Sequence, residues 1–477
     1  MQSAYSVAQI RAAEAAVVAR VPAGSLMARA AHALAVQAST MLGFTYGAKV
    51  ILLVGGGDNG GDALYAGAEI ARRGGQVRAV LASPASTHAD ALDDFRAAGG
   101  KAVDAAELRP DIAVDLIIDG MVGIGASGPL RPPLLPLVAW ANRCHAPVLA
   151  VDLPSGVDPD TGAVIGPAIS AEVTLCFGGL KVGVLVGPGR WHSGCIRLID
   201  IGISGELGYP VLRALDPVDV RELLPRPRPE DDKYSRGVVG VVAGSGEYPG
   251  AAQLAVGSAR LGGVGAVRYA GHAASEVSRQ WSDVLVTETV SGAGRVQAWA
   301  IGPGLGNTES ARQALRQVLL AGVPVLVDAD GLNLLAGEVT LRELMARRTA
   351  PTVLTPHDRE FARLFGEIGA DRVGAARRAA AEVGAVILLK GFATIVAEPG
   401  GECYVNPTGS PVLATAGSGD VLSGLIGSLL ATGLEPLQAA ALGAYLHGAA
   451  GALAAERGPV TAPDLLAALR AVIADAA

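Results

Sequence analysis

The sequence is 477 residues long, and half of its residues are hydrophobic while 17% are charged, which excludes an intrinsically disordered chain. At roughly 150 residues per domain, this length predicts two or three domains with large buried cores. The net charge of −7, without a stripe of lysine and arginine residues, argues against nucleic acid as a partner.

The first half of the chain has the pattern of an α/β domain. Residues 6–42 predict two helices, separated at Val21-Pro22-Ala23-Gly24 because Pro and Gly disfavour continuation of a helix. From Lys49 on, short apolar runs alternate with stretches of helical spacing, which predicts βαβ units and a parallel, doubly wound sheet. The predicted strands are 49–57, 76–83, 113–120, 147–156, 171–178 and 195–203, and the predicted helices are 62–75, 89–100 and 133–144.

The second half repeats this alternation after an interruption. Residues 223–236 are rich in Pro and charge and show no periodicity, so we interpret 211–235 as a linker or extended segment between domains 1–210 and 213–477. The glycine motifs of the two halves differ, which favours two unlike domains. The segments of this second α/β series are 237–246, 266–271, 283–289, 298–306, 324–335, 351–361, 385–391 and 393–400, before a helical region that contains 419–433.

A glycine-rich loop, Gly55 to Asp62, joins the first strand to a helix. Such a loop lets backbone N–H groups at the helix N-terminus approach an anionic ligand. Gly55, Gly57 and Gly60 fit the pattern GxGxxG, but the next strand, 76–83, lacks the acidic residue that would bind a ribose. We therefore discount an ordinary NAD-dependent dehydrogenase; a tight structural turn is the alternative interpretation.

Two further carboxylates stand at predicted strand ends. Asp119 precedes the glycine loop 123–128, and Asp152 precedes Leu153-Pro154-Ser155-Gly156. Because the carboxyl ends of parallel strands form the ligand crevice of an open α/β sheet, these groups are candidates for a general base or a cation ligand. A helix cap or a turn is the alternative role for each one.

The motifs GGGDNGGD, IIDGMVGIGASGPLR and VDLPSGVDPDTG resemble the NAD(P)H-hydrate epimerase family, also called the YjeF N-terminal domain, over roughly residues 1–210. This resemblance implies a Rossmann-like fold, a potassium ion held by Asn59, Asp119 and Ser155, and Asp152 close to the reacting carbon as a catalytic residue. Two departures are Asp58 in place of the usual first Asn and Ala63 in place of a usual Gly, and Ala28 stands where Glu is frequent. The implied substrate-binding residues are Asp58, Asn59, Gly60, Gly61, Asp62, Gly123, Ile124, Gly125, Ala126, Ser127, Gly128, Pro129 and Asp152.

Epimerisation by such a site is chemically reasonable. The hydrate carries a hydroxyl on C6 next to the ring nitrogen, whose lone pair helps to expel that oxygen. Inversion then requires orientation and modest acid–base help, which one carboxylate such as Asp152 could supply.

In the second half, residues 414–424 (ATAGSGDVLSG) place Asp420 at a helix start after a loop of small residues. Backbone N–H groups of such a loop stabilise a transferring phosphoryl group, and Asp420 is placed to take a proton from the attacking hydroxyl. A helix N-cap is the alternative role for Asp420. Two more glycine loops, 243–246 and 302–306, a histidine after a strand (His357) and a lysine after another (Lys390) accompany it.

These pieces resemble the ribokinase-like superfamily and, more narrowly, the NAD(P)H-hydrate dehydratase family (YjeF C-terminal domain) over roughly residues 213–477. The resemblance implies a magnesium ion and ADP as co-substrate in bacterial members, with ATP in eukaryotic ones. Phosphorylation of the C6 hydroxyl would then allow the ring nitrogen to expel phosphate, so dehydration of the S epimer is a kinase reaction with an unstable product. Asp232 departs from the family, which often has His there. The resemblance implies hydrate contacts from Ala251, Gly304, His357 and the catalytic Asp420, and nucleotide contacts from Lys390, Gly391, Phe392, Ala393, Thr394 and Gly419.

The remaining features fit a cytoplasmic enzyme of small molecules. The four cysteines form no CxxC pair or metal-ligand spacing, and the N-terminus lacks the pattern of a secretory signal. Without an apolar stretch of roughly 18 residues, we expect no membrane span. The expected partners are the hydrates of NADH and NADPH and ADP or ATP, together with further copies of the chain in a homo-oligomer. The alternative function is a ribokinase-like small-molecule kinase with a nucleotide-sensing N-terminal domain; a third interpretation gives that domain binding without catalysis.

Overall fold

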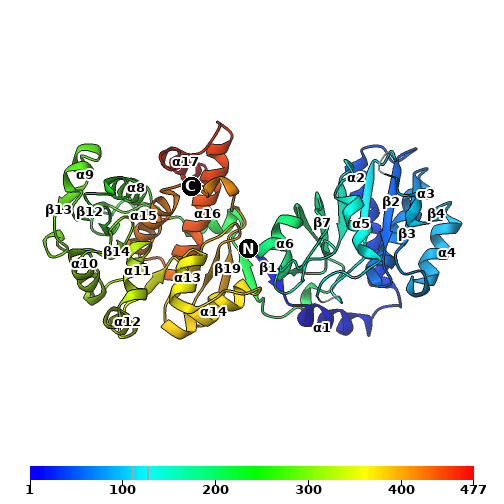
Figure 1. Cartoon of the computed structure of the whole chain (residues 1–477), viewed down its shortest axis with the longest axis horizontal. Helices are drawn as coiled ribbons and strands as arrows, with labels where there is room; N and C mark the ends of the chain where they lie inside the picture. The colour runs from blue at the N-terminus through cyan, green and yellow to red at the C-terminus, as the bar shows by residue number, and fades with distance from the viewer. Residues whose placement is uncertain (110–111, 126–127, 477) are drawn as a thin grey trace. The chain divides into compact units, whose positions relative to one another are not determined.

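A computed structural model describes residues 1–109, 112–125 and 128–476 of the chain (Figure 1). The chain divides into two compact units, one of residues Ser3–Leu212 and one of Met1–Gln2 together with Arg213–Ala477. In Figure 1 the colour runs from blue to green through the first unit and from green to red through the second. Each unit is built around its own set of parallel strands.

The first unit contains a parallel seven-stranded sheet in the order β4-β3-β2-β5-β6-β7-β9. Its strands are β2 (Lys49–Val54), β3 (Gln76–Leu81), β4 (Lys101–Val103), β5 (Leu116–Gly120), β6 (Val148–Val151), β7 (Val173–Phe177) and β9 (Cys195–Ile199). Ala4 and Tyr5 of β1 (Gln2–Tyr5) pair separately with β8 (Leu180–Lys181). The helices are α1 (Val7–Val18), α2 (Ser25–Leu42), α3 (Asp58–Arg72), α4 (Ala89–Ala97), α5 (Leu134–Ala141) and α6 (Gly187–His192).

Both faces of this sheet are buried. Alternate residues of β2 pack into two different cores, Val50 and Leu52 with α1 to α4 on one face, and Ile51 and Leu53 with α5 on the other. Central strands buried on both faces read as continuous apolar runs, which is why the sequence predicted them.

The second unit contains strands in the order β13-β12-β11-β14-β15-β16-β17-β18-β19-β10. Pairing is parallel from β13 to β17, antiparallel between β17, β18 and β19, and parallel again between β19 and β10. The strands are β10 (Leu212–Ala214), β11 (Val238–Val242), β12 (Ala266–Ala270), β13 (Leu285–Thr287), β14 (Ala298–Ile301), β15 (Val325–Val327), β16 (Thr352–Leu354), β17 (Val386–Leu389), β18 (Ile395–Ala397) and β19 (Cys403–Val405).

A large apolar core joins this sheet to α8, α15, α16 and α17, and α15 contacts both α8 and the central strands β11 and β14. Helix α15 is buried along nearly its whole length, so the residues at its N-terminus are held rigidly against the sheet. The helices are α7 (Pro217–Leu223), α8 (Pro249–Ala259), α9 (Ala274–Gln280), α10 (Glu309–Leu320), α11 (Asp330–Gly337), α12 (Val339–Ala346), α13 (Asp358–Phe365), α14 (Arg372–Val383), α15 (Ser418–Ala431), α16 (Pro436–Ala455) and α17 (Ala462–Ala476).

The segment 211–235 differs from the expected linker in its first half. It contains β10 and α7, and α7 begins where the Asp216 side chain accepts hydrogen bonds from the N–H groups of Val218 and Asp219. An N-cap Asp followed by Pro is a signal for the start of a helix. The helix that follows is short and charged and has no apolar periodicity, so the sequence pattern did not predict it. From Leu224 to Arg236 the chain has neither helix nor strand. Among the described residues, no helix combines the length and apolarity needed to cross a membrane.

Candidate active sites

The first candidate site lies where the order of the first sheet reverses. Strand β2 pairs with β3 on one side and β5 on the other, so the loops after β2 and β5 leave the sheet in opposite directions. These loops pack backbone to backbone, since the N–H of Gly55 donates to the carbonyl of Gly120 at 3.0 Å. A Cβ atom at Gly55 would lie only 1.8 Å from the Met121 carbonyl oxygen, so this close approach requires glycine.

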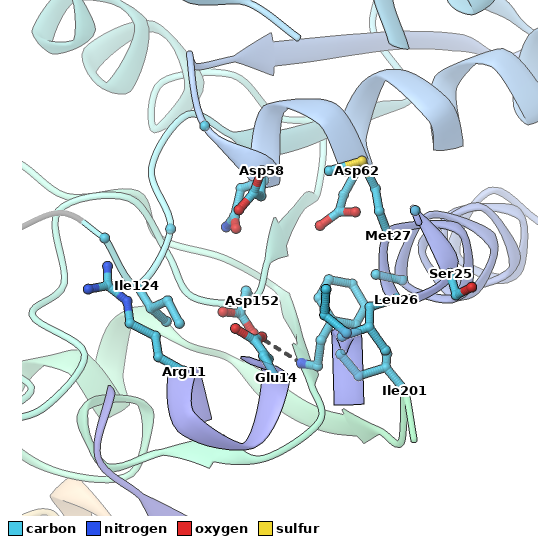
Figure 2. Close-up of a pocket in the computed structure, with 18 of the residues that line it drawn as sticks. Arg11, Glu14, Ser25, Leu26, Met27, Asp58, Asp62, Ile124, Asp152 and Ile201 are labelled. Carbon is cyan, nitrogen blue, oxygen red and sulfur yellow. Dashed lines mark hydrogen bonds between the residues drawn. The ribbon is translucent and has the colours of Figure 1, made fainter. Parts of the chain in front are cut away.

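A pocket of about 650 Å³ opens at this reversal point (Figure 2). Its polar lining comes from α1, from the start of α3 and from the end of β6, and its apolar lining includes Leu26 and Met27 of α2. Figure 2 shows the side chains of Asp58 and Asp62 of α3, Glu14 of α1 and Asp152, which follows β6, around this space. The polar and charged side chains that line it are Arg11, Glu14, Ser25, Asp58, Asn59, Asp62 and Asp152.

The structure brings most, though not all, of the expected epimerase residues to this pocket. Asp58, Asn59, Asp62, Gly123, Ile124, Gly125 and Asp152 line it. Gly60 and Gly61 are buried inside the first turns of α3, and Gly128 and Pro129 are exposed; none of these four lines the pocket. Ala126 and Ser127 lie outside the described residues.

Asp152 combines an unusual backbone conformation with a buried lysine as its ion-pair partner. Its backbone φ is +70°, a region that non-glycine residues rarely adopt, and its side chain is buried. The carboxylate forms an ion pair with Lys181 and accepts a hydrogen bond from the N–H of Phe177 at 3.0 Å. Lys181 also donates to the carbonyl of Phe177 at 2.9 Å. A strained residue with a buried charge partner is typical of a functional position.

The three residues expected to hold a cation also come together. The hydroxyl and N–H of Ser155 donate to the two oxygens of Asp119 at 2.7 and 2.8 Å. The Asn59 amide lies within hydrogen-bond distance of the main-chain carbonyls of Val122 (3.3 Å) and Val151 (2.6 Å). Asp119 is completely buried, and burial raises its pKa to about 6 against the opposing hydrogen bonds from Ser155 and Met121.

The second candidate site lies at the carboxyl ends of β11 and β14 to β17. The two predicted glycine loops meet there, because the N–H of Gly244 donates to the carbonyl of Pro303 at 2.7 Å. Gly304, with a φ of +61°, faces the side chain of Ala251 so closely that a Cβ atom at Gly304 would lie 2.6 Å from it. The expected hydrate contacts Ala251 and Gly304 are therefore neighbours.

Lys390 is the centre of a charged network at this edge. Its Nζ atom lies 2.7 Å from Oδ1 of Asp328 and 3.8 Å from Oε2 of Glu360. The second oxygen of Asp328 accepts a hydrogen bond from the Ser423 hydroxyl on α15 at 2.6 Å. Burial alone would lower the pKa of Lys390, but the negative charges of Asp328 and Glu360 outweigh it and raise the pKa.

Asp420 stands in the first turn of α15, beside this network. Burial first, and then the negative charge of Asp328, raise its pKa to about 7 against the opposing effect of Lys390. The preceding residue, Gly419, faces Lys390 and Asp328, since a Cβ atom there would be 3.6 Å from the lysine Nζ. A carboxyl group that titrates near neutral pH at a helix N-terminus is suited to act as a general base.

Two histidines support this site in different ways. The Nδ1 atom of His357 accepts hydrogen bonds from the N–H groups of Arg359 and Glu360 and so caps α13, while its side chain stays half exposed. His447 of α16 is buried, and its Nε2 lies 3.1 Å from the hydroxyl of Ser418, the first residue of α15. Burial lowers the pKa of His447 to about 4, so it is neutral and fixes Ser418.

The expected nucleotide-binding residues 390–394 join β17 to β18. Gly391 is exposed and Phe392 half-buried, while Ala393 and Thr394 are buried, and the Thr394 hydroxyl donates to the carbonyl of Gly391 at 3.0 Å. The carbonyl of Phe392 lies so close to Gly409 that a Cβ atom there would be 1.7 Å away. Residues 406–409 (NPTG) therefore pack against this turn.

Several residues of both sites were not singled out from the sequence. Asp328 and Asp330 follow an apolar run, the same signal that identified Asp119 and Asp152, and Glu360 lies three residues after His357. Lys181 lies in a two-residue strand and had no comparable signal.

Comparisons with known proteins give the same division of the chain. A family model described as "YjeF-related protein N-terminus" matches residues 23–183, and one described as "NAD(P)H-hydrate dehydratase" matches residues 239–471. A protein of Mycobacterium tuberculosis named bifunctional NAD(P)H-hydrate repair enzyme Nnr is 49% identical over 447 residues, 92% of either chain. Its namesake from Mycobacterium leprae is 48% identical over 471 residues, 97% of this chain and 96% of that one.

Two solved structures resemble the second unit. The ADP/ATP-dependent NAD(P)H-hydrate dehydratase from Bacillus subtilis, co-crystallised with ATP and Mg²⁺, is 31% identical with a TM-score of 0.50, covering 56% of this chain and 99% of that one. A ribokinase-like superfamily protein from Enterococcus faecalis is 26% identical with a TM-score of 0.51, covering 56% of this chain and 98% of that one. These likenesses confirm the predicted α/β class, with a Rossmann-like first unit and a ribokinase-like second unit.

Proposed function

This chain belongs to the family of bifunctional NAD(P)H-hydrate repair enzymes, and we propose that its first unit interconverts the R and S epimers of hydrated NADH and NADPH while its second unit dehydrates the S epimer. We propose ADP as the co-substrate, which leaves as AMP and phosphate. The observation that carries the second activity is Asp420, whose pKa is raised to about 7 beside Lys390 and Gly419 at the carboxyl ends of the strands.

In the dehydratase reaction Asp420 takes the proton of the C6 hydroxyl as that oxygen attacks the terminal phosphorus of ADP. Gly419 and residues 390–394 bind the nucleotide, and Lys390 places its positive charge next to the phosphates. Ala251, Gly304 and His357 position the hydrate. Once the oxygen is phosphorylated, the ring nitrogen expels phosphate, and loss of a ring proton restores the dihydropyridine.

The second site also fits Mg²⁺. The described residues contain no ready-made group of three or more His, Cys, Asp or Glu side chains for a metal ion. Mg²⁺ is usually held by one or two carboxylates together with substrate phosphates. Asp328 and Glu360, the carboxylates on either side of Lys390, would hold it. When bound, Mg²⁺ supplies positive charge that neutralises the transferring phosphate.

In the epimerase reaction we assign catalysis to Asp152, oriented by Lys181 and by the N–H of Phe177. The potassium ion would be held by Asn59, Asp119 and Ser155. A fully buried carboxylate whose hydrogen-bond partners are neutral fits a monovalent cation, since the cation would offset the desolvation of Asp119. When bound, the ion supplies positive charge at the base of the substrate loops.

The test is incubation of the full-length protein with mixed epimers, K⁺, Mg²⁺ and either ADP or ATP, with absorbance measured in the reduced-nicotinamide band. We expect complete recovery of NADH or NADPH, because epimerisation feeds the R form to the dehydratase. Recovery of NADH or NADPH that stops at the fraction of the S epimer in the mixture would contradict the proposed epimerase activity. A stable phosphorylated product would instead favour a small-molecule kinase. The homo-oligomer and the cytoplasmic location remain predictions from the sequence.

A further inference from the structure

Asp62 of α3 is a buried carboxyl group with an unsatisfied oxygen. The residue is 6% exposed, and its Oδ1 atom has no hydrogen-bond partner among the residues that the structure describes. It lines the 650 Å³ pocket of the first unit, and Figure 2 shows its side chain projecting into that space. Because an unpaired buried polar atom is costly, its retention here points to a partner that arrives with the ligand.

The surroundings of Asp62 are strongly acidic. Burial first, and then the negative charges of Asp152, Asp58 and Glu14, raise the pKa of Asp62 well above its usual value. Asp152 differs, because it forms an ion pair with Lys181. The titratable and charged groups around Asp62 are Asp58 on its own helix, Arg11 and Glu14 on α1, His88 at the start of α4, Asp152 after β6 and Lys181 on β8.

The two carboxyl groups therefore have opposite electrostatic surroundings within one pocket. Burial and the nearby negative charges favour the protonated form of Asp62, whereas Asp152 is paired with the ammonium group of Lys181. Two acids that differ in this way provide one proton donor and one proton acceptor. They come from different elements, α3 and the end of β6, so a ring bound between them has one group on each side.

We propose that Asp62 is a second catalytic residue of the epimerisation, the general acid that protonates the departing C6 hydroxyl. The proposal rests on the function assigned above to the first unit. The C6–O bond breaks as Asp62 gives its proton to the oxygen, which leaves as water, and the nitrogen lone pair forms the N1=C6 double bond of an iminium ion. Water then adds to the opposite face of C6 and gives a proton to Asp152. The reverse inversion exchanges the two roles, so no oxidant or other co-reactant is needed.

The mechanism predicts oxygen exchange with solvent. In oxygen-18 water, wild-type protein without ADP should place one solvent oxygen on C6 in each inverted molecule, and the rate of inversion should fall as pH rises through the pKa of Asp62. Inversion in which C6 retains its original oxygen would overturn the proposal, because the C–O bond would then not break. Failure of wild-type protein to invert the hydrate at all would instead overturn the underlying function.

The variant that tests the residue is Asp62→Asn, which preserves shape and removes the proton. We expect inversion at least about 100-fold slower, with the Kd for the hydrate changed only a few-fold. Asp93→Asn is the matched control, because this acid of α4 is largely exposed and remote from the pocket lining, and its inversion rate should equal that of wild type. Asp62→Glu, which restores an acid, should recover part of the rate.

Folding is checked separately by thermal unfolding, in which Asp62→Asn should be at least as stable as wild type at pH 8, since it removes a buried group that resists ionisation. An inversion rate within a few-fold of wild type in Asp62→Asn would overturn the proposal. If that variant does not fold, the oxygen-18 measurement and the pH profile of the wild type still decide the question.

Discussion

The ammonium group of Lys390 lies 2.7 Å from a carboxylate oxygen of Asp328, and the other oxygen of that carboxylate accepts a hydrogen bond from Ser423. This contact ties the loop after β17 to the end of β15 and to α15, which carries Asp420. The ion pair of Lys390 therefore contributes both to the charge of the dehydratase site and to the stability of the second unit.

Lys390→Met should weaken nucleotide binding and destabilise the second unit. The substitution removes the positive charge beside the phosphates and leaves buried Asp328 without its cation, which costs about 3 kcal/mol. We expect KM for ADP to rise at least about 10-fold, with a lower unfolding temperature. The double variant Lys390→Met/Asp328→Asn should regain much of the stability but not the nucleotide affinity; equal losses in both variants would contradict this account.

Asp420→Ala should abolish repair by removing the general base, with a loss in kcat of about 100-fold or more. Inversion of the epimers, measured without nucleotide by separating the two forms, should remain at the wild-type rate. A variant that still restores NADH at a wild-type rate would show that another group activates the hydroxyl.

The pH dependence of dehydration follows from the same residue. Since the base must be ionised and the pKa of Asp420 is raised to about 7, kcat/KM should rise with pH up to about pH 7 and then level off. The contribution of Asp420 to the free energy of unfolding changes with pH in the opposite direction. The folded state binds a proton that the unfolded state releases between about pH 4 and pH 7, so this group's contribution to stability is lost as pH rises through that window.

Asp420→Asn should therefore be more stable than wild type at pH 8, by on the order of 2 kcal/mol, and equally stable below about pH 4. Urea unfolding at the two pH values measures this. A variant that loses stability at pH 8 would mean that Asp420 is held by favourable contacts, contrary to its raised pKa.

Lys181→Met should stop inversion and destabilise the first unit by about 3 to 5 kcal/mol, because Asp152 would be left buried and unpaired. Asp152→Ala should spare repair of one epimer only, since the dehydratase still accepts the S form. Recovery of absorbance from a mixture of epimers would then stop part-way. Asp152→Asn is the cleaner probe of chemistry, because Asn tolerates a φ of +70° better than most residues.

Potassium should stabilise the first unit through Asp119. We expect the unfolding temperature to rise with KCl relative to choline chloride at equal ionic strength, and Asp119→Asn to lose this response. The effect should fade as pH falls below about 6, because a proton on Asp119 then competes with the cation. A potassium response that survives in Asp119→Asn would place the ion elsewhere.

Much of the fold could be predicted because its central strands are buried on both faces. Such strands read as apolar runs, and the polar residues at their ends, among them Asp119, His357 and Lys390, mark the ligand edge of each sheet. The two-residue strand β8 and the three-residue strand β19 gave no periodic signal, so neither was predicted.

The parts of the sites that escaped prediction depend on contacts across the chain. Lys181 becomes significant only because folding places it against Asp152, 29 residues earlier. Glu360 caps its own helix with His357 and also faces Lys390, and only the three-dimensional structure reveals the second role. The unsatisfied oxygen of Asp62 is likewise a property of its surroundings and not of its local sequence.

The order of the two sites along the chain has a consequence for biosynthesis. Every residue assigned here to the epimerase pocket precedes β10, so a nascent chain can complete that site while the second unit is still being translated. The dehydratase site cannot form so early, because Asp420 and the His447 that contacts Ser418 beside it are translated after the whole first unit. An interrupted translation product would therefore invert hydrates without consuming nucleotide.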